Sequence, residues 1–265
     1  MRPGQRIGDV VSEKFIEGRI VGRVDYTDSL FSLRFEAPMD PFIAGQYCRA
    51  GLILPGARGA EITMRPYSMV NAPDQHPHEI LLTLVPQAVG GIVSPALHQL
   101  RVGDAICIGP RANGFFSMPE VPDAEVLWCL ATGTGIGPFM SILHTAAPWQ
   151  KFRRIVVVHA VRYAAELAYR SAFELLSQKH NGALTYVPFV SREAAPDALS
   201  GRIPAAIADG RLEARVGIAL TPENSHCMLC GNPQMVTDTM ATLESKGLRK
   251  HRRRTPGQIT TEAYW

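Results

Sequence analysis

The sequence predicts two domains, an antiparallel β-barrel or sandwich followed by an α/β domain with a parallel sheet. Over residues 17–117, short alternating or apolar runs are separated by turn residues, which is typical of antiparallel strands. After the proline-containing stretch 118–123, buried apolar strands alternate with helical segments, which is typical of a parallel sheet covered by helices. A chain of 265 residues is long enough for two hydrophobic cores. We therefore expect an N-terminal extension over 1–16, the antiparallel domain over 17–117 and the α/β domain over 124–265.

Each expected element is a run with the apolar period of a strand or a helix, bounded by turn residues. In the first domain, strands are expected within GRIVGRV, LFSLRFEA, GQYCRAGLIL, PYSMV, EILLTLV and DAICIG. One short helix is expected there, over 94–100. In the second domain, strands are expected at 126–131, 155–161, 184–190 and 227–230. One helix is expected to begin within 139–146, and two further helices are expected to cover 164–179 and 235–246.

The composition is that of a globular chain, with 46% apolar and 19% charged residues. No apolar run is long enough to span a membrane, and the N-terminal residues lack the apolar core of a secretory signal. The five cysteines are an odd number, and Cys48, Cys107 and Cys129 lie in or beside apolar runs, as reduced thiols do. We therefore expect a cytoplasmic protein that does not contact a membrane.

The net charge of +3 is too small to indicate nucleic-acid binding by itself. Cationic charge is concentrated in one run, KHRRR at 250–254. Such a run could steer an acidic partner, or it could be a solvated basic face. The sequence leaves both interpretations open.

In an open parallel sheet, ligands bind beyond the carboxyl ends of the strands. The first predicted strand leads into TGTGIGP at 132–138, where glycines allow a tight turn and let backbone amides approach a diphosphate. The second strand ends at Arg162, the next ends at Ser191-Arg192, and Arg202 follows shortly after. Three guanidinium groups at one edge would bind a 2′-phosphate, which favours NADPH over NADH, although an isolated arginine is more often a surface ion-pair partner.

The last predicted strand ends in CGNPQ at 230–234, again a turn that leads into a helix. Cys227 and Cys230 have the CxxC spacing of a redox disulfide or of half a metal site. No second pair completes a tetrahedral site, and a strand points these two side chains to opposite faces. We expect no metal, a structural Cys227, and a Cys230 that lines the site.

In the first domain, Arg65-Pro66-Tyr67-Ser68 offers a flavin a stacking ring, a hydroxyl and a positive charge. A tyrosine on a surface strand is the alternative interpretation. The loop GGIVSP at 90–95 could hold a phosphate through its amides, or Ser94 could simply cap the short helix that follows.

Taken together, the chain resembles the bacterial-type ferredoxin (flavodoxin)–NADP reductases, in the branch that ends in Tyr-Trp. The motifs that carry this resemblance are RPYSMVN at 65–71, NGFF at 113–116, LATGTGIGP at 130–138, VHAVRYAAEL at 158–167, VSRE at 190–193, SGRIP at 200–204, MLCGNPQMV at 228–236 and HRRRTPGQITTEAYW at 251–265. The resemblance implies an FAD-binding β-barrel followed by an NADP-binding α/β domain whose C-terminal tail stacks on the flavin.

The resemblance also implies roles for individual residues. Those expected to bind FAD are Arg65, Pro66, Tyr67, Ser68, Leu81, Val85, Ile92, Val93, Ser94, Thr134, Tyr264 and Trp265. Those expected to bind NADP(H) are Val161, Arg162, Ser191, Arg192, Arg202, Cys230, Gly231, Asn232 and Gln234. Tyr67, Ser68 and Cys230 are expected at the reacting rings. Ile92 stands where enteric relatives are expected to have a lysine, so one cationic contact to the diphosphate is missing.

The implied activity is electron transfer between NADPH and an acidic carrier, ferredoxin or flavodoxin, by a monomeric enzyme that binds no nucleic acid. One alternative is the reductase component of an oxygenase system. Such components commonly carry an iron–sulfur ligand set, which the five scattered cysteines do not provide. The alternative from another class is a nucleotide-sensing regulator that binds nucleic acid through the 250–254 run.

Overall fold

The computed structural model describes residues 15–56 and 59–263, and the chain divides into two compact units. The first unit ends at Phe115 and the second begins at Phe116. The stretch 118–123, which the sequence left between the expected domains, therefore belongs to the second unit. The predicted N-terminal extension lies outside the described residues except for its last two positions, and Tyr264 and Trp265 also lie outside them.

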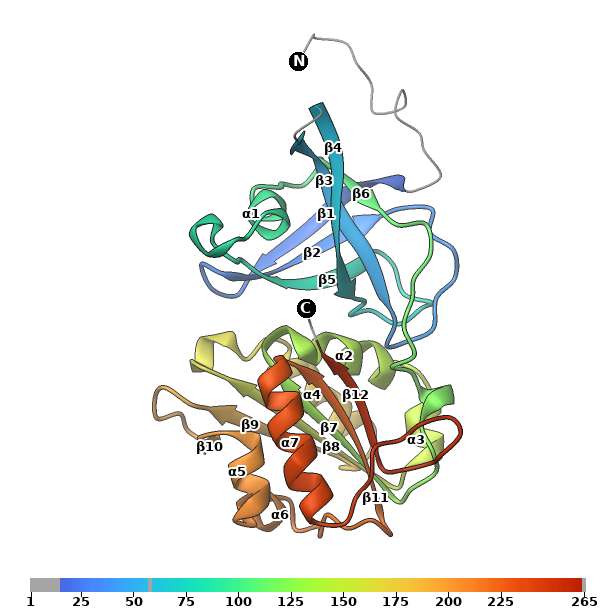
Figure 1. The fold of residues 1–265 in the computed structure, drawn as a ribbon, viewed down its shortest axis with the longest axis vertical. Helices are drawn as coiled ribbons and strands as arrows, with labels where there is room; N and C mark the ends of the chain where they lie inside the picture. The colour runs from blue at the N-terminus through green and yellow to red at the C-terminus, as the bar shows by residue number, and fades with distance from the viewer. Residues whose placement is uncertain (1–14, 57–58, 264–265) are drawn as a thin grey trace. The chain divides into compact units, whose positions relative to one another are not determined.

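The first unit is a six-stranded antiparallel sheet with the order β4-β3-β6-β1-β2-β5 (Figure 1). Its strands are β1 (Ile16–Asp25), β2 (Leu30–Glu36), β3 (Tyr47–Gly56), β4 (Gly59–Ser68), β5 (His78–Thr83) and β6 (Ala105–Ile108). Met69, directly after β4, forms an antiparallel bridge with Ile80 of β5, so the two edge strands meet. The sheet encloses a core that includes Phe31, Leu33 and Phe35 of β2.

Within the described residues of this unit, helical turns lie in one connection. It joins β5 to β6 through the 3₁₀ turn η2 (Gln87–Val89) and the helix α1 (Val93–His98). The alternative in which Ser94 caps this helix is wrong. The N-cap position is Ile92, which makes no side-chain capping bond, and the Ser94 hydroxyl instead accepts a hydrogen bond of 2.9 Å from the Val85 amide.

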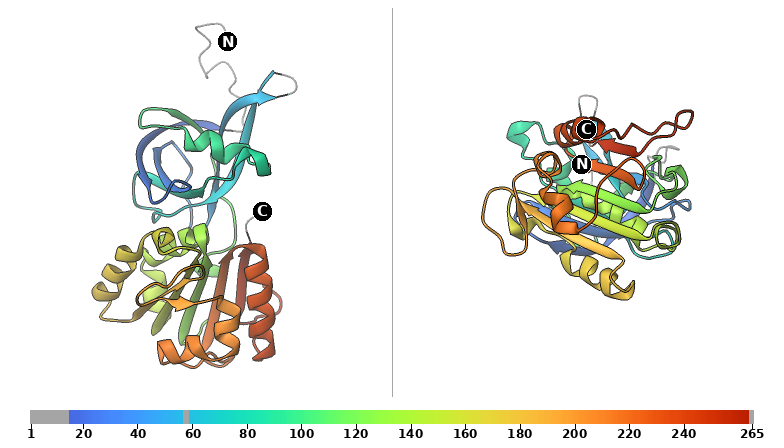
Figure 2. Two further views of the ribbon diagram at one scale, coloured as in Figure 1. Left: turned by 90° about the vertical axis from the view of Figure 1, so that its left-hand side faces the viewer. Right: turned by 90° about the horizontal axis from the view of Figure 1, so that it is seen from below.

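The second unit is a six-stranded sheet with the order β10-β9-β8-β7-β11-β12, in which every neighbouring pair is parallel. Its strands are β7 (Val126–Thr132), β8 (Arg154–Val161), β9 (Leu184–Val190), β10 (Leu199–Ser200), β11 (Ser225–Gly231) and β12 (Ile259–Ala263). Helices lie on both sides of this sheet (Figure 2). The predicted fold class, an antiparallel domain followed by a parallel α/β domain, is confirmed.

The α-helices of the second unit are α2 (Gly137–Leu143), α3 (Ala147–Lys151), α4 (Arg170–Lys179), α5 (Ile203–Ala208), α6 (Arg211–Val216) and α7 (Pro233–Ser245), and its 3₁₀ turns are η3 (Met118–Glu120), η4 (Gly133–Ile136) and η5 (Ala164–Glu166). Apolar residues of α5, α6 and α7 pack with Trp128 and Val158 into one core. The Trp128 indole donates a 3.0 Å hydrogen bond to the Ser225 hydroxyl within the buried sheet. No helix among residues 15–56 and 59–263 is long and apolar enough to cross a membrane.

The helix predicted over 164–179 is wrong in its first half. The turn η5 ends at Glu166, and α4 begins only at Arg170, because Tyr169 adopts a positive φ of 63° that interrupts the helical path. The helices α3, α5 and α6 and the strands β10 and β12 were not predicted.

A buried histidine links two strands of the parallel sheet near its amino edge. His226 of β11 is 1% exposed, and its Nε2 lies 2.9 Å from the Thr260 hydroxyl on β12. Burial, followed by electrostatic interactions with His251 and Lys151, lowers the pKa of His226 from 6.5 to about 3. The folded chain therefore keeps this imidazole neutral under conditions in which the unfolded chain protonates it.

We expect the free energy of unfolding to fall as the pH is lowered from about 6.5 toward 3, because only the unfolded chain then binds a proton at His226. One such proton gives a slope of at most about 1.4 kcal/mol per pH unit. His226→Gln keeps a polar group near Thr260 but removes the titration, so its stability should depend less steeply on pH. Urea unfolding of both proteins across this range measures the difference, and identical slopes would contradict the assignment.

Candidate functional site

The carboxyl edge of the parallel sheet gathers four connections that the sequence singled out. The strands β7, β8, β9 and β11 end at Thr132, Val161, Val190 and Gly231 respectively. Their register aligns these ends, since Thr132 pairs with Ala160 and Val161 pairs with Val190. The loops that follow therefore leave the sheet at one edge, where α2 and α7 begin (Figure 1).

Two predicted arginines lie side by side at this edge. The Arg192 amide donates a 3.0 Å hydrogen bond to the Arg162 carbonyl, and the Ser191 amide and hydroxyl both donate to the Val161 carbonyl at 3.1 and 3.2 Å. The backbones that follow β8 and β9 are thus joined directly. The side chains of Arg162 and Arg192 therefore start from neighbouring positions on two hydrogen-bonded backbones.

The third arginine reaches the same region through β10. Ser200 of β10 pairs with Val190 of β9, and Arg202 follows as the residue before α5. Arg162, Arg192 and Arg202 are all exposed, and none of their guanidinium groups makes a hydrogen bond or ion pair within the described parts of the chain. Three unneutralised guanidinium groups in one region are suited to a doubly charged phosphate.

The glycine loop after β7 is packed closely against the loop after β11. A Cβ added to Gly135 would lie 2.4 Å from the Cys230 carbonyl oxygen, and one added to Gly231 would lie 2.3 Å from the Thr132 hydroxyl oxygen. The Asn232 amide donates a 2.9 Å hydrogen bond to that same hydroxyl. Glycine at these two positions therefore allows the two loops to touch through their backbones.

Asn232 and Gln234 also have structural roles at the start of α7. The Asn232 side chain caps the helix by accepting from the amides of Gln234 and Met235 at 2.9 and 3.3 Å. The Gln234 side chain donates to Asp238 at 2.7 Å. Both residues lie at the predicted edge of the sheet, while their contact with nucleotide stays a prediction.

The cysteines of β11 are both fully buried. Cys227 belongs to the core beneath α5 and α7, as expected for a structural thiol, and burial raises its pKa. Cys230 lies three residues further along β11, next to the glycine loop. Its place at the reacting rings stays a prediction. No group of side chains among residues 15–56 and 59–263 is arranged to hold a metal ion.

In the first unit, the predicted flavin residues lie at the end of β4. Tyr67 and Ser68 pair with Cys48 and Tyr47 of β3, and β4 is an edge of the sheet, which accommodates Pro66. Tyr67 is half-buried against the barrel core, and burial raises the pKa of its hydroxyl to about 12. Tyr67 thus presents a neutral ring with a protonated hydroxyl.

The other predicted flavin residues surround the connection between β5 and α1. Leu81 is buried in β5, while Ile92 is 56% exposed and Val93 and Ser94 begin α1. A Cβ added to Gly91 would lie 1.8 Å from the Val85 carbonyl oxygen, so this loop folds back closely on itself. Arg65 is exposed and donates to the Met64 carbonyl.

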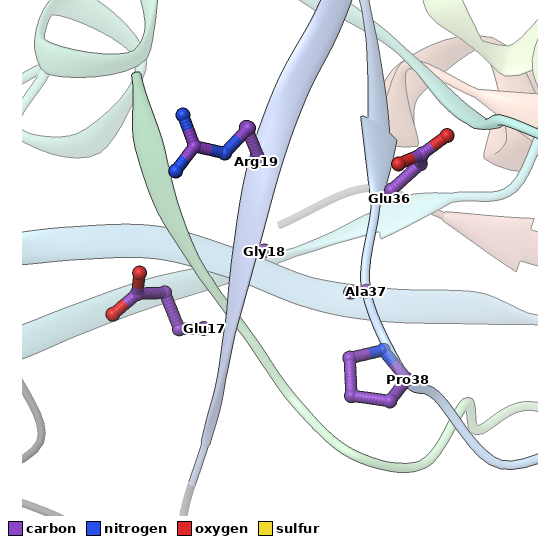
Figure 3. A pocket seen from close by; sticks show the side chains of 6 residues that line it. All are labelled: Glu17, Gly18, Arg19, Glu36, Ala37 and Pro38. Carbon is purple, nitrogen blue, oxygen red and sulfur yellow. The ribbon is translucent and has the colours of Figure 1, made fainter. Parts of the chain in front are cut away.

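A separate hollow lies in the first unit, and none of the predicted site residues lines it. It has a volume of about 420 Å³ and is lined by Glu17, Gly18, Arg19, Glu36, Ala37 and Pro38. Figure 3 shows that its charged side chains diverge, with Glu17 and Arg19 on one side of β1 and Glu36 beyond β2. A ligand site needs polar groups that converge, so this hollow receives no assignment.

The chain is similar to known proteins over most of its length. Residues 129–241 match the family model described as the oxidoreductase NAD-binding domain. Flavodoxin/ferredoxin–NADP reductases of Shigella flexneri and Escherichia coli K12 are each 45% identical to the chain, covering 95% of it and 99% of the relative. A ferredoxin NADP⁺ reductase structure from Neisseria gonorrhoeae, with bound FAD and NADP, is 33% identical with a TM-score of 0.87, covering 95% of this chain and 99% of that one. The chain belongs to the flavodoxin/ferredoxin–NADP reductase family.

Proposed function

We propose that the protein transfers electrons between NADPH and a ferredoxin or flavodoxin, with FAD as its resident cofactor. Membership of the reductase family supports this activity. The observation that carries the choice of nucleotide is the group of three exposed arginines beyond β8, β9 and β10. An NAD-specific site usually offers a carboxylate there instead.

The residues of the first unit fit a flavin. Tyr67 offers an aromatic face, Ser68 a hydroxyl next to it, and Arg65 an exposed positive charge. Val93 and Ser94 lie in the first turn of α1, where amides have no acceptor within the helix and are available to phosphate oxygens. Val85, Leu81 and Ile92 are apolar groups of the same connection, and Tyr264 and Trp265 are proposed to complete the site.

The residues of the second unit fit NADPH. Arg162, Arg192 and Arg202 hold the 2′-phosphate through charge-assisted hydrogen bonds, and Thr134 of the glycine loop is proposed to lie between the flavin and the nicotinamide. The remaining contacts are assigned to Val161, Ser191, Cys230, Gly231, Asn232 and Gln234. When bound, FAD supplies the ability to accept two electrons from a nicotinamide and to release them singly.

The basic run at 250–254 is separate from the nucleotide edge. It leads into β12, which is parallel to β11, so the run enters the sheet at the opposite, amino edge. Arg253 is held there by Glu120 through hydrogen bonds of 2.8 and 2.7 Å. We infer that the enzyme is a cytoplasmic monomer that recognises an acidic carrier and binds no nucleic acid, with the remaining cations of this run available for steering.

The proposed function predicts that anaerobic addition of NADPH bleaches the visible flavin absorbance of the yellow protein. Subsequent addition of oxidised ferredoxin or flavodoxin should restore the absorbance, because the carrier withdraws the electrons. Coupled reduction of cytochrome c with each carrier then gives its turnover. A colourless preparation, or a flavin that NADPH leaves oxidised, would contradict the proposal, and a shift of labelled DNA would favour the regulator instead.

A further inference from the structure

His159 of β8 connects the glycine loop to the interior of the sheet. It is 0% exposed, its Nε2 lies 3.1 Å from the Gly133 carbonyl oxygen, and its Nδ1 lies 3.3 Å from the Tyr186 hydroxyl. A carbonyl oxygen only accepts, so Nε2 carries the hydrogen and donates it to Gly133. Burial lowers the pKa of His159 to about 4, so the ring is neutral at pH 7 and Nδ1 accepts from the tyrosine.

Tyr186 is itself fixed by packing. Its ring stacks on Phe173 of α4, with centroids 5.1 Å apart and an angle of 9° between the planes. Burial raises the pKa of the Tyr186 hydroxyl, which therefore keeps its proton and remains a donor. A continuous series of contacts thus runs from α4 through β9 and β8 to the loop after β7.

The contact with His159 helps to hold the direction of one peptide group, the first of the 3₁₀ turn η4. The Gly133 carbonyl and the Thr134 amide belong to the same planar trans peptide, so they point in opposite directions. With the carbonyl directed at the buried imidazole, the Thr134 N–H is directed away from it. The positive φ of 52° at Gly133 permits this orientation, and the close approach of Gly135 to Cys230 holds the loop from the β11 side.

We propose that His159 and Tyr186 are positioning residues that aim the Thr134 amide at the nicotinamide mononucleotide half of NADPH, which includes the phosphate nearer the nicotinamide. The proposal rests on the proposed function of the carboxyl edge, but it assigns residues that contact no nucleotide themselves. His159 acts through the Gly133 peptide, and Tyr186 acts by fixing the tautomer and orientation of His159. The arginine region that takes the 2′-phosphate is not part of this series of contacts.

The test compares two ligands on the flavin-loaded protein, NADP⁺ and 2′-phospho-AMP, by calorimetric titration. In His159→Ala, the Kd for NADP⁺ should rise about threefold to tenfold, the effect of losing one hydrogen bond that orders the loop. The Kd for 2′-phospho-AMP should stay unchanged, because that ligand lacks the half that meets the loop. His159→Gln should recover part of the loss, since its amide can donate to the same carbonyl.

Tyr186→Phe provides the milder variant, because it removes one hydroxyl and keeps the ring that stacks on Phe173. It should weaken the binding of NADP⁺ by a smaller factor than His159→Ala does, and it should speed hydrogen exchange of the backbone amides in 133–136. Val156→Ala, a buried change in the same strand, is the matched control and should lower the melting temperature without changing either Kd.

Equal weakening of both ligands, or unchanged NADP⁺ affinity in folded His159→Ala, would overturn the positioning role. If His159→Ala does not fold, Tyr186→Phe decides the question in the same way. Failure of the unaltered protein to bind either ligand would instead reject the proposed function.

Discussion

Replacing Arg192 or Arg202 by alanine is expected to cost about 1.5–3 kcal/mol of NADPH binding for each arginine, a factor of roughly 10 to 150. NADH binding should change little, because NADH has no 2′-phosphate. The two exposed guanidinium groups are not neutralised by any carboxylate within the described parts of the chain, so a phosphate is their natural partner. Values of kcat/KM for both nucleotides measure the change in preference.

Arg153→Ala is a suitable control for this prediction. Arg153 precedes β8 at the amino edge of the sheet, and its side chain pairs with Glu125 at 3.4 Å in an exposed position. Its removal lowers the net charge equally but leaves the carboxyl edge intact, so the ratio of NADPH to NADH activity should not change. A parallel loss for both nucleotides in Arg192→Ala and Arg202→Ala would reject the 2′-phosphate assignment.

The gathering of these arginines could be predicted because it follows from topology. The carboxyl ends of parallel strands meet at one edge, so residues after successive apolar strands are brought together whatever the details of packing. The structure places Arg162 and Arg192 in direct backbone contact there. The short strand β10, which carries the chain to Arg202, could not be predicted, because two residues have no detectable period.

Other features depend on contacts that are distant in the sequence. Tyr169 breaks the expected helix with a positive φ, which a local propensity for helix does not reveal. His159 lies in the apolar run IVVVHAV and was not singled out, since a histidine in a buried strand gives no local signal of its partners. Its role emerges only once β7 and β9 are placed on either side of β8.

Ser94 illustrates the same limit in the first unit. Its position before a short helical run suggested a capping serine, but the structure uses its hydroxyl to bind the Val85 amide across the loop. The sequence thus pointed to the loop at 90–95 but did not reveal the hydrogen bond that Ser94 makes with Val85. The loop can fold back on itself because Gly91 has no side chain, since a Cβ there would collide with the Val85 carbonyl. The sequence shows Gly91 only as one glycine of a pair and gives no sign of this close contact.

Gly135→Ala is expected to slow flavin reduction by NADPH about 100-fold. The new Cβ would lie 2.4 Å from the Cys230 oxygen and 2.7 Å from the Cys230 carbonyl carbon, and both are backbone atoms of β11, which lies between β7 and β12 in the sheet. The loop after β7 must therefore move, and a displacement of about 1 Å near reacting groups can lower the rate by that factor. Anaerobic stopped-flow mixing with NADPH measures the rate of bleaching directly.

Gly182→Ala separates this effect from the general cost of replacing a glycine. Gly182 has a positive φ of 75° and open space around its Cα, and it precedes β9 at the amino edge of the sheet. Its replacement should lower stability by about 1 kcal/mol through backbone strain and leave the rate of flavin reduction unchanged. The affinity of Gly135→Ala for 2′-phospho-AMP should also remain, because the arginine region does not include this loop. A folded Gly135→Ala enzyme that NADPH reduces as fast as Gly182→Ala would show that the glycine loop has no part in presenting the nicotinamide.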